Sequence, residues 1–523
     1  MSLTKVSYSL ITGTPVSVLD FGADPTGVQD STAAIQSAVD SLTSQSTLVI
    51  NPGTYKITTV TFDGKSNIRV SAYGAKINLV GNAAGFVVKG VCSGITVCGG
   101  TITGDGANRD TVTPQIGWLV GDAAGAYVGN VFMQDITVDA ANVGFKFSAG
   151  TGTGSGQTNN VKIVNCQAKD IVGVLAGRGY GFTFSQASYS SLVNCQAINC
   201  QRHGIYFAEG RDYAATNCII RDHRSTVYTS AYRVAMSISR SRNVAVSNCV
   251  FDNCYDGTVE IDVDTQGTAP DNVSIGTTLT NCTFLNSSLA DIRIGTVPAV
   301  EGVVSDVVIA NNVMVRASGN TVASITIEGG TRVKIINNLI DGTAAASNFR
   351  AITLNATSGA TYTQDVEVTG NSLYSSGYGV EIASALQTGT SNVRVLNNNI
   401  VATSAELFFV GGEDITTNNN LIYNRSNGTN SNRTYSSSGS LVVIPVGGVD
   451  VLTMSPSSAT TVSNFSGGVQ GQRLTLYFTN GNTTLKNTNL YLQSGTDFVS
   501  TAYDSLSLVY LSGFWRETGQ SLN

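Results

Sequence analysis

The sequence predicts an all-β protein whose main part is a right-handed parallel β-helix. Three observations support this prediction: a repeated Asn step, a short alternating apolar run before each step, and almost no helical spacing. Successive steps are about 20 to 35 residues apart, which is the period range of a solenoid. The steps lie at Asn165, Asn194, Asn217, Asn248 and Asn281, each followed by Cys, and at the Asn-Asn pairs that begin at Asn311, Asn337, Asn397 and Asn418.

The run before each step alternates apolar and polar residues, as in Val161–Ile163 and Val333–Ile335. Such alternation indicates a half-buried strand, so each repeat is predicted to be one coil. The Asn marks the corner, because Asn tolerates the left-handed backbone conformation and its amide can bond the next coil. Stacked coils should therefore form an Asn ladder. The Cys residues that follow should stack about 4.8 Å apart as a column of free thiols.

Composition limits the classes of function. The chain has 523 residues, of which 56 are Gly, 42% are hydrophobic and 12% are charged, and its net charge is −6. An acidic chain does not suit nucleic acid, whereas a neutral or acidic polysaccharide remains compatible. No apolar run is long enough to insert into a membrane, and the first five residues do not begin a signal peptide. With two His and no Cys-x-x-Cys motif, neither a metal nor a cofactor is predicted.

The chain divides into four predicted parts. Residues 1–19 form a leader or attachment segment, and residues 20–47 form a capping segment. That segment holds a helix with Asp30 as N-cap and Ile35, Ala38 and Val39 on its apolar face. Residues 48–430 form the β-helix, whose first coil the helix should cover, because open strand edges invite aggregation. Residues 431–523 contain strand-like runs without Asn steps and predict a β-sandwich.

Three segments near the start carry a family resemblance. Asp20–Ala23, Asp30–Gln36 and Asn51–Tyr55 closely resemble the opening signature of the pectate-lyase-like β-helix superfamily. The preceding Leu3–Tyr8 and Val16–Leu19 resemble the join that leads into this signature in bacteriophage tailspikes. The resemblance implies a homotrimeric spike of the virion, made in the host cytoplasm and anchored to the phage tail or to another tailspike. It also implies a C-terminal module for trimerisation or glycan binding. It does not fix the chemistry, since the superfamily includes hydrolases, lyases, esterases and silent proteins.

A second strand in most coils leads to candidate site residues. We align these strands by inward residues, and outward residues of neighbouring coils then form rows. The aligned inward residues are Phe182, Ile205, Val234, Val259, Ile292, Ile325, Ile352 and Val380. The densest acidic strand places Glu260, Asp262 and Asp264 outward.

Two carboxyls on this strand could flank a glycosidic bond. Residues i and i+2 lie about 6.5 to 7 Å apart, and inverting hydrolysis uses carboxyls about 6.5 to 9.5 Å apart. Glu260 and Asp262 are the leading pair, with Glu209, Asp264 and Glu328 as alternates. The competing interpretation is a solvated acidic stripe offset by Arg293.

A basic and aromatic cluster should complete a polysaccharide groove beside the acids. Tyr stacks on sugar rings and Arg binds acidic sugar carboxylates. The predicted binding residues are His203, Tyr206, Arg211, Tyr232, Arg233 and Arg293. The same cluster could serve a lyase through His203, Tyr232 or Arg233. His203 or His223 could also serve an esterase, or each His could simply hydrogen-bond its own loop.

The function predicted from the sequence is that of a phage tailspike that recognises and depolymerises a bacterial surface polysaccharide, either capsule or O-antigen. The predicted reaction is endo-glycoside hydrolysis. A polysaccharide lyase, a deacetylating esterase and a receptor-binding spike without catalysis remain the alternatives.

Overall fold

The computed structural model describes residues 14–522 except for a set of gaps. The gaps are 122–126, 149–156, 176, 224–233, 255–256, 264–272, 296–302, 356–362, 383–389, 404, 410–412, 419, 425–428, 431, 436–441, 447–448, 467 and 469. The chain forms two compact units, Met1–Val308 and Ile309–Asn523. The fold is an all-β parallel solenoid of about 14 turns with a small C-terminal region of mixed sheet, as predicted.

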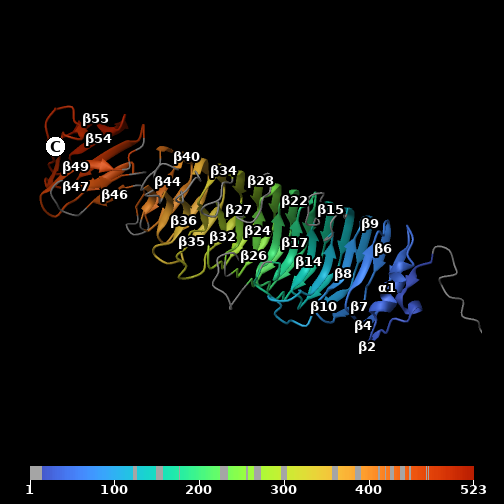
Figure 1. Ribbon diagram of the computed structural model, residues 1–523. Coiled ribbons are helices and arrows are strands. Elements are labelled where there is room, and N and C mark those ends of the chain that lie inside the picture. Colours follow the sequence, from blue (N-terminus) through green and yellow to red (C-terminus); the bar gives the residue numbers. More distant parts are fainter. Residues whose placement is uncertain are drawn as a thin grey trace, which may run out of the picture. The chain divides into compact units, whose positions relative to one another are not determined.

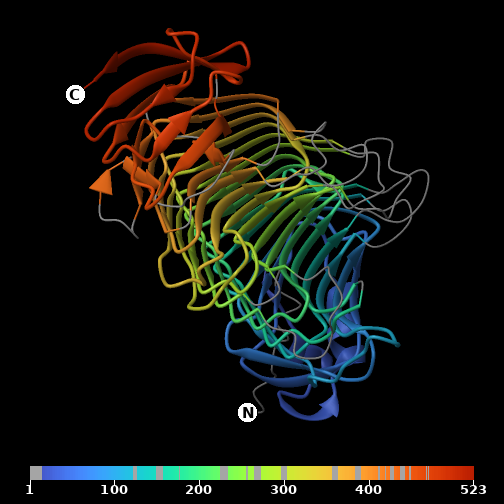
Figure 2. The same cartoon turned by 90° about the vertical axis from the view of Figure 1, so that its left-hand side faces the viewer.

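Most coils of the solenoid contribute one strand to each of three sheets, here called A, B and C, which are parallel except for the last strand of sheet B (Figures 1 and 2). In the first unit, sheet A contains β1 (Val16–Ser17), β3 (Thr47–Val49), β6 (Ile68–Ser71), β9 (Val91–Cys98), β12 (Tyr127–Gln134), β15 (Gln157–Val164), β19 (Ser191–Val193), β22 (Arg211–Thr216), β25 (Arg242–Ser247), β28 (Val273–Thr280) and β31 (Val303–Ala310), with β18 (Ala187–Ser188) beside β15. Sheet B contains β2 (Thr26–Asp30), β4 (Gly53–Ile57), β7 (Ala75–Leu79), β10 (Thr101–Thr103), β13 (Thr137–Asp139), β16 (Gln167–Lys169), β20 (Gln196–Ile198), β23 (Ile219–Arg221), β26 (Val250–Asp252) and β29 (Thr283–Leu285). Sheet C contains β5 (Val60–Asp63), β8 (Ala84–Lys89), β11 (Ile116–Val120), β14 (Val143–Ser148), β17 (Tyr180–Ser185), β21 (His203–Ala208), β24 (Met236–Ser239), β27 (Val259–Asp262) and β30 (Ile292–Ile294).

The second unit has the same three-strand coils followed by the C-terminal sheets. Sheet A contains β34 (Gly330–Ile336), β37 (Thr363–Thr369), β40 (Thr390–Leu396) and β43 (Glu413–Asn418). Sheet B contains β32 (Val313–Val315), β35 (Leu339–Gly342), β38 (Ser372–Ser375), β41 (Asn399–Ala402), β44 (Leu421–Asn424) and β45 (Thr429–Asn430). Sheet C contains β33 (Ile325–Ile327), β36 (Arg350–Leu354), β39 (Tyr378–Ile382) and β42 (Ala405–Phe409).

The N-terminal helix covers the end of sheet C, as expected. After a short 3-10 turn, η2 (Val18–Phe21), the helix α1 (Thr32–Asp40) begins one residue later than predicted. Ser31 is the N-cap, although the Asp30 carboxylate still accepts a hydrogen bond from the Thr32 amide at 2.7 Å. The Gln36 amide bonds both the N–H and the C=O of Thr61 in β5, the terminal strand of sheet C. Gln36 thus replaces the missing neighbouring strand and blocks edge pairing.

The corners between sheets A and B confirm the backbone part of the Asn prediction. The eight Asn residues from Asn165 to Asn397 that were predicted at corners all have positive φ, between 52° and 57°. The side-chain ladder, however, is formed one residue later than predicted. Its members in the second unit are the inward-facing Asn312, Asn338, Asn371, Asn398 and Asn420. The correction follows from the strand period, because the corner residue turns outward and its successor turns inward.

In the first unit the same inward position holds the predicted thiol column of Cys166, Cys195, Cys218, Cys249 and Cys282. All nine cysteines of the chain are free and buried. Burial raises the pKa of Cys166 to about 12, so its thiol stays protonated and inert. The solenoid interior also contains stacked rings, such as Phe145 on Phe182 with centroids 4.9 Å apart.

The C-terminal region contains two sheets that enclose a separate core. The larger sheet has the strand order β46 (Asn432–Tyr435), β48 (Val451–Met454), β50 (Arg473–Phe478), β54 (Ser505–Leu511), β55 (Phe514–Ser521) and β52 (Leu490–Tyr491). The smaller has the order β47 (Val442–Pro445), β49 (Thr460–Ser466), β51 (Thr483–Leu485) and β53 (Phe498–Val499). Trp515 lies fully buried in their core. No helix in the described part of the chain is long and apolar enough to cross a membrane.

Candidate functional site

The outer face of sheet C in the first unit brings the main candidate residues into register. Its first outward row, read from the N-terminal coils, is Val87, Leu119, Lys146, Thr183, Tyr206, Ser237, Glu260 and Arg293. Its second outward row is Ser148, Ser185, Ala208, Ser239 and Asp262. Members of a row are about 4.8 Å apart across neighbouring strands. Tyr206, Glu260, Asp262 and Arg293 therefore share one surface, as predicted.

One step of the predicted alignment is wrong. Val259 pairs with Met236, not with Val234, so the outward residues of β24 are Ser237 and Ser239. The two-residue error arises in the insertion before β24, where sequence periodicity gives no register. The residues Tyr232 and Arg233, predicted to bind substrate, fall in that insertion and lie outside the described residues.

The polar floor of this face is buried even though it points away from the solenoid core. Thr183, Ser237, Ser239, Glu260 and Asp262 are each at most 6% exposed. The hydroxyls of Thr183 and Ser239 have no hydrogen-bond partner within the described part of the chain. A buried hydroxyl without a partner costs about 1 to 3 kcal/mol. Such groups are usually satisfied by water or a ligand, so this floor is suited to binding a polar molecule.

The two leading carboxylates lie at the C-terminal end of this floor on β27. Glu260 Oε1 accepts a hydrogen bond from Arg293 Nη1 at 3.0 Å across the neighbouring strand. Asp262, two residues further along the strand, points to the same face with its Cα roughly 6.5 to 7 Å away. Asp264, the third predicted acid, lies outside the described residues. Glu328 belongs to the second unit, where it follows β33 at a half-buried position.

Glu209, another predicted alternate, lies at the corner after β21 and not on the floor. Its backbone is left-handed, with φ of 56°. Its carboxylate forms an ion pair with Arg240 and accepts a hydrogen bond from the Gln186 amide at 2.7 Å. Gln186, Glu209 and Arg240 occupy the same corner in three successive coils. Glu209 therefore links three successive coils at the edge of the site. Its neighbours in the sequence did not indicate this structural role.

An aromatic cluster lies at the N-terminal ends of the strands. The His203 ring stacks on Tyr206 with centroids 5.3 Å apart and lies 5.0 Å from Tyr180. Arg202 lies over the Tyr180 ring at 5.6 Å. Burial lowers the pKa of His203 to about 3. Its Nδ1 is 2.9 Å from the Val234 carbonyl, which can only accept, so Nδ1 carries the proton. A neutral imidazole with so low a pKa is a weak base.

The other basic candidates lie elsewhere. Arg211 begins β22 of sheet A and lies over the Tyr189 ring at 5.4 Å, so it does not share the sheet C face with Glu260. His223 Nε2 lies 2.7 Å from the Arg202 carbonyl and must donate to it. Both histidines therefore hydrogen-bond backbone carbonyls of neighbouring coils, 31 and 21 residues away, and not their own loops as the alternative interpretation expected.

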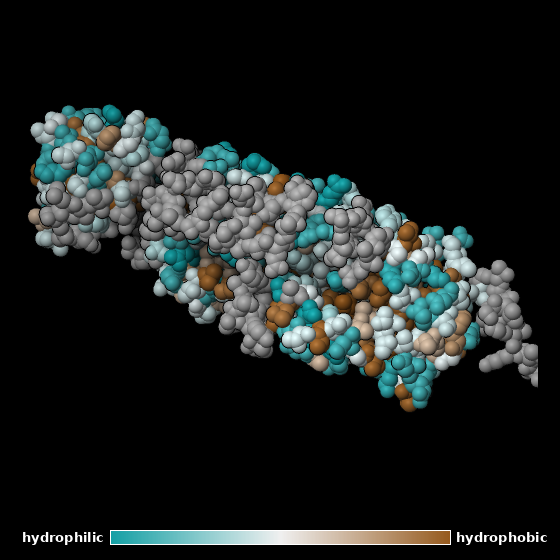
Figure 3. All heavy atoms as spheres, viewed as in Figure 1, coloured by the Kyte–Doolittle hydropathy of each residue, from teal (hydrophilic) through white to brown (hydrophobic). Residues whose placement is uncertain are grey.

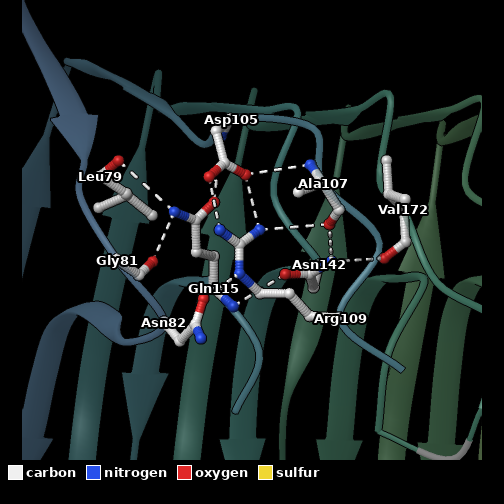
Figure 4. A network of polar contacts seen from close by, with 9 residues as sticks. All are labelled: Leu79, Gly81, Asn82, Asp105, Ala107, Arg109, Gln115, Asn142 and Val172. Atoms are coloured by element: carbon white, nitrogen blue, oxygen red, sulfur yellow. Dashed lines mark hydrogen bonds and ion pairs between the residues drawn. The ribbon is translucent and has the colours of Figure 1, made fainter. Parts of the chain in front are cut away.

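Polar contacts fix the loops beside the strand starts of sheet C (Figure 4). Asp105 binds Arg109, whose Nε donates to Asn82 Oδ1 at 2.6 Å. Asn142 Nδ2 donates to the carbonyls of Ala107 and Val172 at 2.9 and 3.0 Å. These contacts join the loops of four successive coils next to the strand starts of sheet C. Long-range loop contacts of this kind leave no periodic signal in the sequence.

The N-terminal part of the same face is apolar. Ile116, Val143 and Tyr180 form a second hydrophobic cluster, against which Ala84, Leu119 and Tyr206 pack. In Figure 3, apolar atoms gather on the visible surface in the region where Figure 1 labels β8 and β14. The face thus changes from apolar to acidic along the solenoid. Within the described residues, no group of His, Cys, Asp and Glu side chains is arranged to hold a metal ion.

One family model matches the N-terminal part of the chain. Residues 15–259, just under half of the chain, match a family described as rhamnogalacturonase A/epimerase, pectate lyase-like. The match is with pectate-lyase-like β-helix proteins and ends one residue before Glu260. Among curated proteins, none matches the chain.

Solved structures resemble the chain at low identity. The A-module of the mannuronan C-5 epimerase AlgE4 from Azotobacter vinelandii is 18% identical, covers 77% of this chain and 99% of its own, and has a TM-score of 0.48. A double mutant of the tailspike protein of E. coli bacteriophage HK620, in complex with a pentasaccharide, is 13% identical over 90% of this chain and 80% of its own, with a TM-score of 0.49. The surface adhesin PfbA of Streptococcus pneumoniae is 13% identical over 97% and 99%, with a TM-score of 0.38. At these identities and TM-scores, none of the three structures assigns an activity to this chain.

Proposed function

We propose that the chain binds a polysaccharide along the outer face of sheet C and cleaves it by endo-glycoside hydrolysis at Glu260 and Asp262. The observation that carries this proposal is the buried polar floor. Five outward residues are nearly inaccessible, two of their hydroxyls have no hydrogen-bond partner among the described residues, and two carboxylates lie at one end. A chain of sugar rings offers the hydroxyls that such a floor needs. The name of the matched family joins polysaccharide cleavage with epimerisation and supports a carbohydrate substrate.

The contacts of the two carboxylates suggest which of them activates water and which protonates the leaving oxygen. The Arg293 guanidinium bonded to Glu260 favours the ionised form of that carboxyl. Glu260 is therefore the candidate to activate the attacking water. Asp262, equally buried and on the same face, is the candidate to protonate the leaving oxygen. The aromatic cluster at Tyr180 and Tyr206 provides a stacking surface for sugars of the bound chain.

The biological setting that we propose is a phage tailspike that acts as a homotrimer on a capsule or O-antigen. This extension rests on the resemblance of Leu3–Tyr8 and Val16–Leu19, which precede the N-terminal signature, to the corresponding join in tailspikes. Under this proposal the spike locates in the virion and uses the sheet C face to grip and shorten the host polysaccharide. Electron microscopy of the parent phage with an antibody against this chain tests the location, and labelling absent from the tail contradicts it.

The test of the chemistry is the double variant Glu260→Gln/Asp262→Asn against a panel of purified capsules and O-antigens. For the wild-type chain we expect new reducing ends without unsaturated, ultraviolet-absorbing products. The double variant should lose at least about 10³-fold in rate while still binding the polymer. The matched control is Glu381→Gln, because Glu381 is 5% exposed, lies outward on β39 and pairs with Arg350 at 2.6 Å. It should keep full activity.

The products also decide between the alternatives. Unsaturated ends would establish a lyase, and released acetate an esterase. The low pKa and carbonyl bond of His203 count against both of these when His203 is the base. Binding without any product would establish a receptor-binding spike. Full activity in the double variant would overturn our assignment of the site.

A further inference from the structure

A row of two arginines, a valine and a tyrosine crosses the outer face of the larger C-terminal sheet. Across β50, β54, β55 and β52, the row consists of Arg473, Val509, Arg516 and Tyr491, each paired with the next in register. Phe514 lies beside Tyr491 at the end of the row. The two arginines are two strands apart, roughly 10 Å. The row therefore alternates charged and apolar groups at a regular spacing.

The aromatic end of the row is exposed and held in a fixed arrangement. Tyr491 is 50% exposed and Phe514 is 41% exposed, although residues of this size are usually buried. Their rings meet edge to face, with centroids 5.1 Å apart. The Arg516 guanidinium lies over the Tyr491 ring at 4.7 Å from the centroid. Stacking on Tyr491 limits the freedom of Arg516, so less conformational entropy is lost when it binds a ligand.

The charge of this face is unbalanced. The outward residues of β50, β54, β55 and β52 include Arg473 and Arg516. The buried Glu517 faces the core, where its carboxylate accepts a hydrogen bond from the backbone N–H of Gln493. Within the described residues, neither arginine forms an ion pair. In contrast, Lys486 is paired with Asp497 at 2.6 Å and Arg394 lies 3.6 Å from Glu367. The row therefore offers two uncompensated positive charges beside exposed rings.

We propose that this row, Arg473–Val509–Arg516–Tyr491, binds an acidic polysaccharide. Sugar rings stack on Tyr491 and Phe514 and pass over Val509, while carboxylates of successive acidic sugars bind Arg516 and Arg473. Face-to-face packing of two copies would place arginine against arginine and so fits the row less well. The inference does not depend on the proposed cleavage, since it concerns a different unit and requires no chemistry.

Binding of a soluble polyuronate, polygalacturonic acid, tests the proposal in the full chain. The measurement is titration calorimetry in the Glu260→Gln/Asp262→Asn background, so that the proposed cleavage does not consume the probe. Fully methyl-esterified polymer, which has the same backbone without charge, is the paired probe. We expect binding of the acid form that weakens with added salt, and no binding of the ester.

The variants locate the binding on the row. Arg516→Ala should weaken the Kd for the polyuronate about tenfold or more, and Tyr491→Ala about threefold or more. Arg516→Lys, which keeps the charge but loses the planar fork, should fall between the wild-type chain and Arg516→Ala. Arg394→Ala, which removes an exposed arginine from β40, is the matched control and should leave the Kd unchanged.

Several results would overturn the proposal. These are no binding of the polyuronate, equal binding of the ester, or an unchanged Kd in Arg516→Ala. Light scattering after size exclusion tests whether a second copy of this chain occupies the face instead. A lower molar mass in Tyr491→Ala or Arg516→Ala would show that the face joins subunits. The cleavage assay with the wild-type chain does not depend on this binding measurement. Either proposal can therefore fail while the other stands.

Discussion

The residue that follows the left-handed corner between sheets A and B is cysteine through much of the first unit and asparagine in the second. Both series point into the solenoid, and both repeat once per coil. The thiols make long contacts to carbonyls, such as Cys249 Sγ to Ala215 O at 3.6 Å, and weak contacts to neighbouring thiols, such as Cys249 with Cys218. The amides make a continuous ladder, such as Asn338 Nδ2 to Asn371 Oδ1 at 3.0 Å. One backbone position therefore supports two different ways of filling a corner.

The Asn ladder satisfies the polar atoms of its amides almost completely. The Asn371 oxygen accepts from both the backbone N–H and the Nδ2 of Asn338. Its own Nδ2 donates to Asn398 Oδ1 and to the Ile335 carbonyl, each at 2.9 Å. The thiol column has weak donors and weak acceptors, so it depends on burial instead. Removing one amide should therefore leave its neighbours unsatisfied, whereas removing one thiol should leave mainly a small cavity.

The largest expected effect is that of breaking the ladder in its middle. Asn371→Leu should destabilise the second unit by about 3 to 6 kcal/mol, because the N–H and Nδ2 of Asn338 and the Ile335 carbonyl lose their partners. Hydrogen exchange of β34, β37 and β38, together with the thermal midpoint, measures the loss. Unchanged exchange in these strands would contradict a cooperative ladder.

A second substitution moves the amide into the thiol column. Cys249→Asn should cost roughly 2 to 3 kcal/mol, because a single buried amide has no ladder to join. Cys218→Asn combined with Cys249→Asn should cost roughly 1 to 2 kcal/mol less than the sum of the single variants, since the two amides can bond each other. A double-mutant cycle by urea unfolding checks this, and strict additivity would count against the equivalence of the two corners.

Of the thiol column and the Asn ladder, only the thiol column titrates at alkaline pH. Burial raises the pKa of Cys166 from 9.0 to about 12, so the folded state keeps a proton that the unfolded state releases. Its contribution to stability is complete below about pH 9 and is lost as the pH rises towards 12. We expect the wild-type chain to lose up to about 1.4 kcal/mol per pH unit relative to Cys166→Ala over this range. Parallel pH profiles for the two proteins would refute the prediction.

The smallest effect is that of removing a single thiol. Cys249→Ala should cost about 1 kcal/mol, because the lost contacts are dispersive and the hydrogen bonds are weak. The same urea unfolding measures it, with the Asn371→Leu variant as the reference. A cost as large as that of Asn371→Leu would show that the thiols form a network after all.

The periodicity of the sequence was sufficient to predict the repeating coil and most of the strand register of sheet C. Phe182, Ile205, Val259 and Ile292 are inward and Glu260 is opposite Arg293, because strand alternation and one residue per coil leave little freedom. The prediction fails at Val234, where the long insertion before β24 has no period. It also misses the corner pair of Glu209 and Arg240, which are 31 residues apart in the chain.

In the candidate site, too, some features could be predicted from the sequence and others could not. Outward acids on one strand can be read from alternation, so Glu260 and Asp262 were foreseeable. Their burial, together with that of Ser237 and Ser239, was not, because exposure depends on what covers a face. The placement of Arg211 on sheet A was also unforeseeable, since one corner residue decides which sheet the following strand enters.

By itself, the sequence determined the repeat, the left-handed corners, the buried thiol column and the helix that covers the first coils. These features depend on residue type and on a fixed period, which are local properties. Only the tertiary structure decided that the amide ladder lies one residue after the corner, that both histidines bind carbonyls, and that the acids of β27 lie on an enclosed polar floor. Those features depend on which coils and loops meet in space, and contacts between residues 20 to 65 positions apart leave no local pattern.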